Sequence, residues 1–347
     1  MLVRTLFLSL VLAVCFAAAG ETPWVHAADN GKKLVVYTSR TSKTDAALME
    51  QFSKETGIAV TLVSGKAKEL LERLKEEGAV PQADLFITVD GGLLDAAKQQ
   101  GSLQPMTAAP VLANVPAALR DKDNQWIGLS TRARVIVYSK ERVTPEQLST
   151  YEDLADPKWK GKVVMRPSAA LYDQSLLASL IALDGEAAAA DWVKGMAANF
   201  ARPPKGNDRA QAKDIASGTG DVTLMNTYYL GRMLNGSDPE ERKAAQSVGV
   251  FFPNQKTTGT HINICGIALV KDAPNKADAE KLIAWLTDVP RQEALAAGNY
   301  EYPVNPKAKK PDLLKQWGDF KVQALDFSIL GRNNAKAREL FSKGGWE

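Results

Sequence analysis

The sequence predicts an α/β fold made of two lobes. Between residues 33 and 89, apolar runs of strand length alternate with helical patterns. This order is typical of an α/β domain with a largely parallel sheet. The same alternation begins again after Pro157, which predicts a second lobe of similar build.

The first lobe is expected to open with a strand at residues 33–39 and a helix at 44–56 that ends at Gly57. A second strand follows at 58–63, a charged amphipathic helix at 68–77, and a third strand at 84–89. Loops that follow such strands converge on one edge of the sheet, where ligands bind.

In the second lobe we expect strands at 162–165 and 222–225 and helices at 173–182, 186–197 and 209–217. The extended apolar segments 132–139 and 248–252 are predicted to cross between the lobes as a hinge.

The first 27 residues are predicted to be a secretory signal peptide. Arg4 precedes an apolar run from Leu6 to Ala19, and Val25 and Ala27 are small residues at the −3 and −1 cleavage positions. We therefore expect cleavage near Ala27 and export to the periplasm. The apolar run is too short for a comfortable membrane span, and no later stretch approaches that length.

Cleavage leaves one cysteine, Cys265, and one histidine, His261. No intrachain disulfide is then possible. The formal charge of +3 is mild and its lysines and acids are interspersed, so it gives no case for a nucleic-acid partner or a membrane-binding patch.

Adjacent phenols near the middle of the chain are the first candidate for chemistry. Tyr228 and Tyr229 follow the strand pattern 221–225 and precede Arg232. Hard cations prefer oxygen donors, and a bound metal can displace the proton of a phenol whose free pKa is near 10. Ferric iron is therefore the first candidate ligand, although a Tyr-Tyr pair alone more often serves packing and hydrogen bonding.

Motifs in the same order along the mature chain resemble those of periplasmic ferric-ion-binding proteins of bacterial ABC importers, and especially the cyanobacterial, iron-deficiency-induced branch. They are Val36–Arg40, Pro81–Asp84, Arg132–Tyr138, Asp156–Gly161, Gly206–Asp208, Asn226–Arg232, Val250–Gln255, Gly259–His261 and Glu301–Val304.

The resemblance implies the two-lobed periplasmic-binding-protein fold of type II, with mixed sheets, flanking helices and crossing hinge strands that let the lobes close like a clamp. The implied first lobe is 28–131 plus about 253–290. The implied second lobe is 132–252 plus about 291–347. Expected partners are a membrane permease and its ATPase, and the expected state is a monomer.

The family's metal ligands map onto Tyr172, Tyr228 and Tyr229. Three phenolates would balance the three charges of ferric iron. The chain departs from its relatives after Arg40, where they carry a His-Tyr pair and this sequence has Thr41 and Ser42. An alkyl hydroxyl is much harder to ionise than a phenol, so the first-lobe ligand is missing.

A small synergistic anion such as carbonate is expected to complete the coordination. Arg132 matches a family arginine at the anion site, and its guanidinium fork suits a planar oxyanion. Ser168 and Ala169 are expected at the start of the helix bearing Tyr172, where backbone N–H groups are free. Asn207 and Asn226 could donate further hydrogen bonds.

Three residues are expected around this set. Arg232 would lower the phenol pKa values by its charge, Tyr37 would pack beneath the site, and Asp90 is a possible partner of Arg132 across the cleft. Alternatively, Arg232 lies on a solvated helix face. His261 is interpreted as a structural histidine.

Other classes of protein stay open at this stage. The chain lacks Gly-x-Ser-x-Gly, His-Glu-x-x-His, a P-loop lysine and a dinucleotide fingerprint, so an enzyme is not expected. The serious alternative is a binding protein of the same fold for an oxyanion, a polyamine or a thiamine-like organic ligand.

Overall fold

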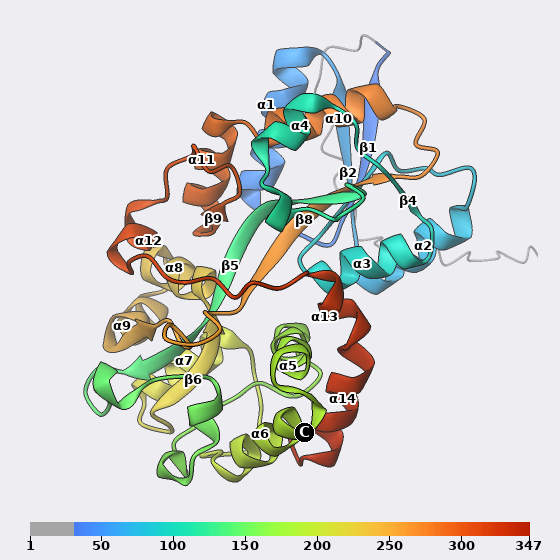
Figure 1. Ribbon diagram of the computed structural model, residues 1–347. Helices are drawn as coiled ribbons and strands as arrows, with labels where there is room; N and C mark the ends of the chain where they lie inside the picture. Colours follow the sequence, from blue (N-terminus) through green and yellow to red (C-terminus); the bar gives the residue numbers. More distant parts are fainter. Residues whose placement is uncertain (1–30) are drawn as a thin grey trace, which may run out of the picture.

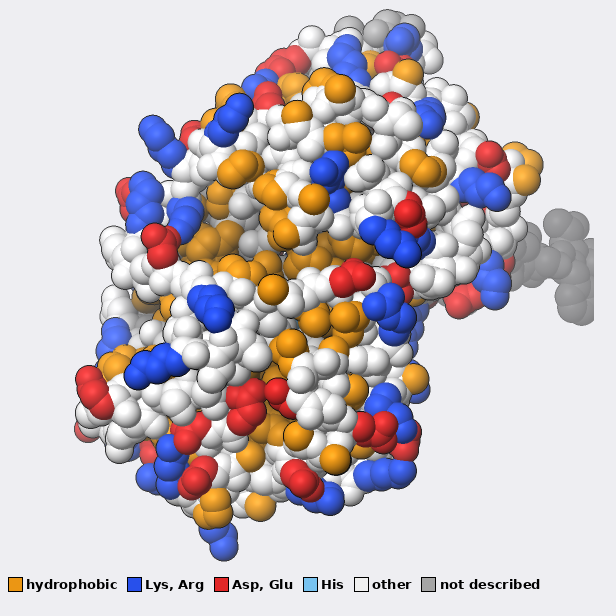
Figure 2. Space-filling model, in the orientation of Figure 1, with side chains coloured by type: hydrophobic (Ala, Val, Ile, Leu, Met, Phe, Trp, Pro, Cys, Tyr) orange, Lys and Arg blue, Asp and Glu red, His pale blue; other side chains and the backbone are white. Residues whose placement is uncertain are grey.

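The computed structural model describes residues 31–347. The expected signal peptide, residues 1–27, lies outside the described residues. Figure 1 shows an upper and a lower group of elements, which we call the first and second lobes, with strands β5 (Trp126–Ser139) and β8 (Ile262–Val270) running from one to the other. In the same orientation, Figure 2 shows hydrophobic side chains gathered in a hollow between the two lobes.

The strands form one continuous path in the order β2-β1-β3-β8-β5-β6. β1 pairs in parallel with β2 and β3, whereas β8, β5 and β6 join antiparallel. The largely parallel sheet predicted from the sequence therefore holds only for the first three strands. The remaining strands of the path are β1 (Lys33–Thr38), β2 (Ala59–Ser64), β3 (Leu85–Thr88) and β6 (Val222–Asn226). Short strands β4 (Leu103–Gln104), β7 (Val248–Phe251) and β9 (Tyr302–Pro303) pair at its sides.

The crossing strands differ in part from the prediction. The predicted segment 132–139 is the second-lobe end of β5, which pairs with β8 before residue 134 and with β6 from residue 134 on. The prediction that the segment 248–252 crosses between the lobes was wrong. This segment contains β7, which pairs with β5 at its far end, from Ile136 to Ser139. The second crossing strand is β8, which the sequence pattern did not reveal.

Helices cover both faces of the first-lobe sheet. α1 begins after Ser42, whose side chain accepts a hydrogen bond from the backbone N–H of Asp45, and ends at Gly57 with φ of +71°. The helices of this region are α1 (Lys43–Thr56), α2 (Ala67–Glu77), α3 (Gly91–Gln99), α4 (Ala109–Asn114) and α10 (Lys276–Leu286). Buried apolar residues between β1, β3, β8 and α1, α4 and α10 make up the core of this lobe.

The second lobe packs its helices around β6 and the far end of β5. They are α5 (Leu171–Asp184), α6 (Glu186–Ala198), α7 (Asp208–Ala216), α8 (Thr227–Asn235) and α9 (Pro239–Ser247). The prediction of a strand at 162–165 was wrong, because this segment forms no regular strand. Only Val163 forms isolated bridges, to Phe200 and Val222, because the segment is enclosed between a turn at Gly161 and the proline at Pro167.

The C-terminal helices divide their contacts between the lobes. α11 (Val289–Asn299) packs against α1 and α10, α13 (Ser328–Arg332) contacts both α3 and α5, and α14 (Asn334–Lys343) packs on α5 and α6. The short helix α12 (Asp312–Gln316) lies between α11 and α13 in the sequence. Within residues 31–347, no helix combines the length and the apolar character that crossing a membrane requires.

Candidate metal site and anion pocket

Three phenols meet at the starts of two helices. β6 leads directly into α8, so Tyr228 and Tyr229 lie in the first turn of α8, while Tyr172 lies in the first turn of α5. The hydroxyl of Tyr228 donates to the hydroxyl of Tyr172 at 3.3 Å. The rings of Tyr228 and Tyr229 lie 4.2 Å apart between centroids. The structure thus brings together the three tyrosines that the sequence singled out.

Burial and mutual repulsion keep two of these phenols protonated. Burial raises the pKa of Tyr228 well above its usual value, and the neighbouring Tyr172 and Tyr229 add to this, while Arg132 opposes it. The pKa of Tyr229 is raised by burial and by Asp208, and Arg166 opposes that rise. Tyr228 and Tyr229 are therefore neutral near pH 7 until a stronger positive charge displaces their protons.

Arg132 faces the tyrosines with unused hydrogen-bond donors. Its side chain is 1% exposed, and its Cζ lies 5.5 Å from the centroid of the Tyr172 ring. One nitrogen, Nη2, donates to the carbonyl of Val89. Among the described residues, its Nε and Nη1 have no hydrogen-bond partner. Buried donors without partners are costly, so this guanidinium is suited to a bound oxyanion.

Arg166 is a second cation beside Tyr172, and the sequence analysis missed it. Its Cζ lies 5.9 Å from the Tyr172 ring centroid, and its Nη1 donates to Asp208. A sequence signal existed, since Arg166 lies at the end of a buried segment just before the helix that carries Tyr172. Nothing in the spacing, however, connected it to Asp208.

The predicted anion-binding residues have different surroundings. Asn226 is buried and its Nδ2 lacks a partner within the described chain, whereas its Oδ1 accepts from Arg134 at 3.3 Å. Asn207 is exposed and caps α7 through its Oδ1, which accepts from the backbone of Ala210 at 3.1 Å. Ser168 and Ala169 line a separate cavity of about 640 Å³ together with Lys66, Lys68 and Arg338. Of these four residues, Asn226 alone has a contact in the charge network next to the tyrosines.

Arg232 is close to the phenols, while Tyr37 is engaged elsewhere. The Cζ of Arg232 lies 4.9 Å from the Tyr228 ring centroid, and its Nη2 reaches Asn299 Oδ1 at 3.5 Å. Tyr37 is buried and donates to Glu77 Oε1 at 2.5 Å, with Arg73 over its ring. Glu77 and Arg73 are both residues of α2, so Tyr37 makes these contacts with that helix.

Asp90 links the two lobes instead of pairing with Arg132. Its Oδ1 caps α3, and its Oδ2 accepts from Ser175 Oγ at 2.5 Å and from Asn263 Nδ2 at 2.6 Å. The ion pair between Arg132 and Asp90, considered as an alternative from the sequence, is wrong because these donors already occupy the carboxylate and Arg132 donates to Val89.

His261 is buried at the crossing of β5 and β8. Its Nδ1 lies 3.0 Å from Gln323 Oε1. Burial lowers the pKa of its imidazole from 6.5 to about 4, with Arg134 and Arg132 acting in the same direction. The ring is thus neutral near pH 7, as a structural histidine should be.

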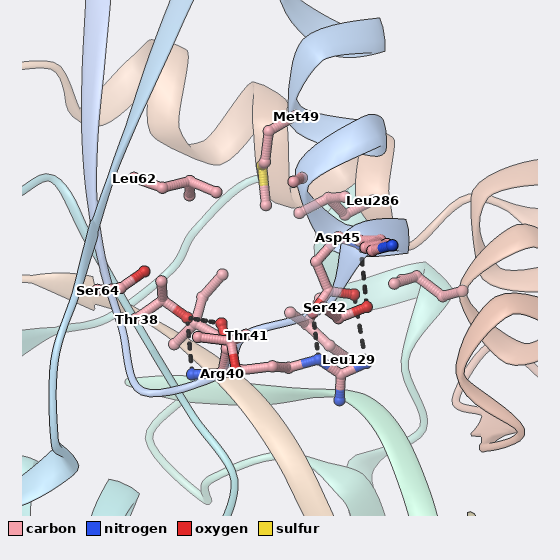
Figure 3. A pocket seen from close by; sticks show the side chains of 14 residues that line it. Thr38, Arg40, Thr41, Ser42, Asp45, Met49, Leu62, Ser64, Leu129 and Leu286 are labelled. Carbon is pink, nitrogen blue, oxygen red and sulfur yellow. Dashed lines mark hydrogen bonds and ion pairs between the residues drawn. The ribbon is translucent and has the colours of Figure 1, made fainter. Parts of the chain in front are cut away.

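The first-lobe loop contains no phenol or imidazole but borders a cavity. Arg40, Thr41 and Ser42 line a space of about 350 Å³ with an apolar side formed by residues such as Met49, Leu62 and Leu286 (Figure 3). Ser42 donates to Asn299 Oδ1 at 2.6 Å, and Arg40 pairs with Asp45 and with Glu301 at 2.8 Å. Arg40 and Ser42 thus have their partners within the protein.

The arrangement of groups excludes several kinds of metal site. Across the described part of the chain, no group of three or more His, Cys, Asp or Glu side chains could hold a metal ion. The phenol oxygens of the tyrosine cluster are hard donors, and Arg132, a guanidinium with unused N–H groups, lies near the ring of Tyr172. Such a set suits a small, highly charged cation and a co-bound anion.

The fold defines a class of protein, namely two-lobed solute-binding proteins. Residues 81–327 match the family model described as bacterial extracellular solute-binding protein. The chain is 44% identical over 348 residues to Iron uptake protein A1 of Synechocystis sp., covering 99% of this chain and 97% of the relative. It is 31% identical to the Major ferric iron-binding protein of Neisseria meningitidis, covering 79% of this chain and 81% of that one. The chain belongs to the bacterial extracellular solute-binding proteins and, within them, to the branch of the iron uptake proteins.

Solved structures agree with this placement. The structure described as Trichodesmium IdiA (FutA) in complex with iron and citrate ligands superposes with a TM-score of 0.87 at 47% identity, covering 91% of this chain and 100% of that one. The ferric binding protein from Campylobacter jejuni gives a TM-score of 0.85 at 37% identity, covering 90% and 100%. The chain has the type II periplasmic-binding-protein fold, which confirms the fold class predicted from the sequence.

Proposed function

We propose that this protein captures ferric iron between its lobes through the phenolate oxygens of Tyr172, Tyr228 and Tyr229. The observation that carries the proposal is the meeting of these phenols, with Tyr228 and Tyr172 joined at 3.3 Å. The names of the relatives support iron as the cargo, since they are iron uptake and ferric-iron-binding proteins.

Charge balance favours the ferric ion over divalent ions. Loss of three phenol protons gives three negative charges, which neutralise Fe³⁺ in a site where burial penalises net charge. A divalent ion would leave one phenol protonated or the site negatively charged. Neutral phenols are also poor ligands for ferrous iron.

A small anion completes the coordination in this proposal. Three protein donors leave positions open on a six-coordinate ion, and Arg132 offers its unpartnered Nε and Nη1 beside Tyr172. A small oxyanion such as carbonate could accept a hydrogen bond from one of these unpartnered nitrogens while another of its oxygens binds iron. Asn226 Nδ2 is a further donor without a partner in the described chain.

Transport requires partners beyond the ion. We place the protein in the periplasm as a monomer, where the iron-loaded form would dock on a permease that its ATPase drives. We divide the chain into a first lobe of 28–131 plus about 253–290 and a second lobe of 132–252 plus about 291–347. The contacts of α11 with α1 and α10 favour moving that helix to the first lobe.

The test is iron retention after gel filtration of protein incubated with ferric citrate. The double variant Tyr228→Phe/Tyr229→Phe removes two donor oxygens without changing the shape of the rings. We expect about one iron per chain in the native protein, by the three-for-three charge balance, and none in the variant, with both chains equally folded by circular dichroism. Equal iron contents would overturn the assignment.

A further inference from the structure

We propose that Arg134 is a positioning residue of this site, whose guanidinium fixes the helix of Tyr172 relative to the helix of Tyr228 and Tyr229. The inference rests on the proposed function, because it concerns how the same phenols are held. Arg134 itself does not bind the ion.

Arg134 is placed at the centre of the second lobe by the crossing strand β5. It lies two residues after Arg132 and therefore on the same face of the strand. Its side chain is 1% exposed. Nη1 donates to Asp208 Oδ1 at 2.7 Å, and Nη2 donates to Asp173. One guanidinium thus connects β5 to the beginnings of α5 and α7.

The partners of Arg134 adjoin the candidate iron ligands. Asp173 is the residue directly after Tyr172, and Asn226, whose Oδ1 accepts from Arg134 Nη1 at 3.3 Å, lies two residues before Tyr228. The backbone of Arg134 already pairs with Asn226 in the sheet. The guanidinium adds the connection that the sheet cannot supply, from β6 to the first turn of α5.

Asp208 makes this connection rigid. Its Oδ1 also accepts from the backbone N–H of Asn226 at 3.2 Å, and its Oδ2 accepts from Arg166. The chain of contacts therefore runs from Arg166 through Asp208 and Arg134 to Asp173. Two guanidinium groups and two carboxylates balance each other, so this network holds the phenols in place without adding net charge to the site.

Only arginine fits this task. A guanidinium is planar and presents its donors in a fixed fork, whereas the ammonium of lysine is a single point that cannot reach two separate carboxylates in the same geometry. Arg134→Lys keeps the positive charge and removes the bridge. Asp173→Asn removes the negative charge from the other side of the same bridge, so the hydrogen bond is no longer charge-assisted, while the side-chain volume is kept.

The experiment loads each purified chain with ferric citrate and records two quantities: the wavelength of the phenolate-to-iron absorption band and the rate at which excess EDTA removes the iron. Arg142→Lys is the matched control. Arg142 lies in the same lobe and donates to Asp221 at 2.6 Å and to the carbonyls of Ile215 and Gly220, but it has no partner next to a candidate ligand.

We expect Arg134→Lys and Asp173→Asn to shift the band and to speed iron loss about tenfold or more, since a charge-assisted hydrogen bond is lost. Arg142→Lys should keep the native band and rate. If both test variants lose thermal stability but keep the native band and rate, Arg134 is merely structural and the inference fails. A native protein with no band at all would instead contradict the proposed function, so the two failures are distinguishable.

Discussion

The hydroxyl of Tyr228 donates a hydrogen bond to the hydroxyl of Tyr172 over 3.3 Å, although the two residues lie 56 positions apart in the sequence. The fold itself thus holds the hydroxyl of Tyr172 on α5 against the hydroxyl of Tyr228 on α8. A cation that binds here must displace phenol protons, but two of its donor oxygens are already held together, and such preorganisation lowers the cost of binding.

Replacing Tyr172 alone tests the third ligand. Tyr172→Phe removes the oxygen that accepts from Tyr228 and should weaken iron binding by more than about 100-fold, because even residues that only support metal ligands cost 10–100-fold when lost. Competition with citrate measures the change. Tyr138→Phe is the control, since Tyr138 lies on β5 with its ring against Gly249. An unchanged affinity in Tyr172→Phe would remove this residue from the ligand set.

Arg132→Lys tests the anion pocket. The lysine keeps a positive charge but loses the two N–H groups that lack partners in the described chain. We expect iron retention by the native protein to depend on bicarbonate and that of the variant to depend on it much less. Titrations with bicarbonate in carbonate-free buffer measure this dependence. The same bicarbonate curve for both proteins would argue against an anion at Arg132.

Iron binding should release protons. Burial raises the pKa values of Tyr228 and Tyr229, so both enter the reaction as neutral phenols at pH 7 and leave it as phenolates. We expect these two residues to release about two protons per iron, and hence an affinity that falls steeply as the pH decreases. Calorimetry in two buffers of different ionisation enthalpy counts these protons, and a count near zero would exclude phenolate ligands.

His261 should make the fold sensitive to acid. Because the folded protein lowers the pKa of this imidazole from 6.5 to about 4, the neutral ring contributes stability that is complete above pH 6.5. That contribution is lost as the pH falls through about 4. The shift corresponds to about 3 kcal/mol. Urea unfolding from pH 7 to 4 should show a smaller loss of stability in His261→Gln than in the native protein, and parallel losses would refute this role.

Gly231 allows α8 to approach the turn after α11. A Cβ at Gly231 would lie 2.5 Å from the Cβ of Tyr300, well inside van der Waals contact. We expect Gly231→Ala to displace the helix that carries Tyr228 and Tyr229, with a cost of about 1–3 kcal/mol to stability and a weaker affinity for iron. Gly65→Ala is the control, because a Cβ at Gly65 would meet only the flexible side chain of Leu70. Gly218 is unsuitable as a control, because its φ of +83° would strain an alanine.

The elements of the fold were largely predictable. Helix α1 follows its cap at Ser42 and ends at Gly57 with the predicted end points nearly unchanged, because local capping and periodicity decide such boundaries. The crossing role of β8 was not predictable, since its nine residues are all buried and a buried run carries no sign of its partners. The segment 162–165 had a strand pattern, but its pairing with the neighbouring backbone is limited to isolated bridges at Val163 and forms no continuous ladder.

The site was predictable only in part. The grouping of Tyr172 with Tyr228 came from resemblance to a family, because a separation of 56 positions gives no local signal of contact. Arg134 and Arg166 were not recognised, since their meaning depends on Asp173 and Asp208 lying within reach in space. That Arg132 has spare donors likewise follows from packing and cannot be derived from residue types.

Visible absorption during titration with ferric citrate, with and without bicarbonate, tests the central claim most directly. Phenolate bound to ferric iron gives a charge-transfer band, so we predict a coloured complex that saturates at about one iron per chain and requires bicarbonate. A saturating titration without any such band would contradict the claim that Tyr172, Tyr228 and Tyr229 bind the ion.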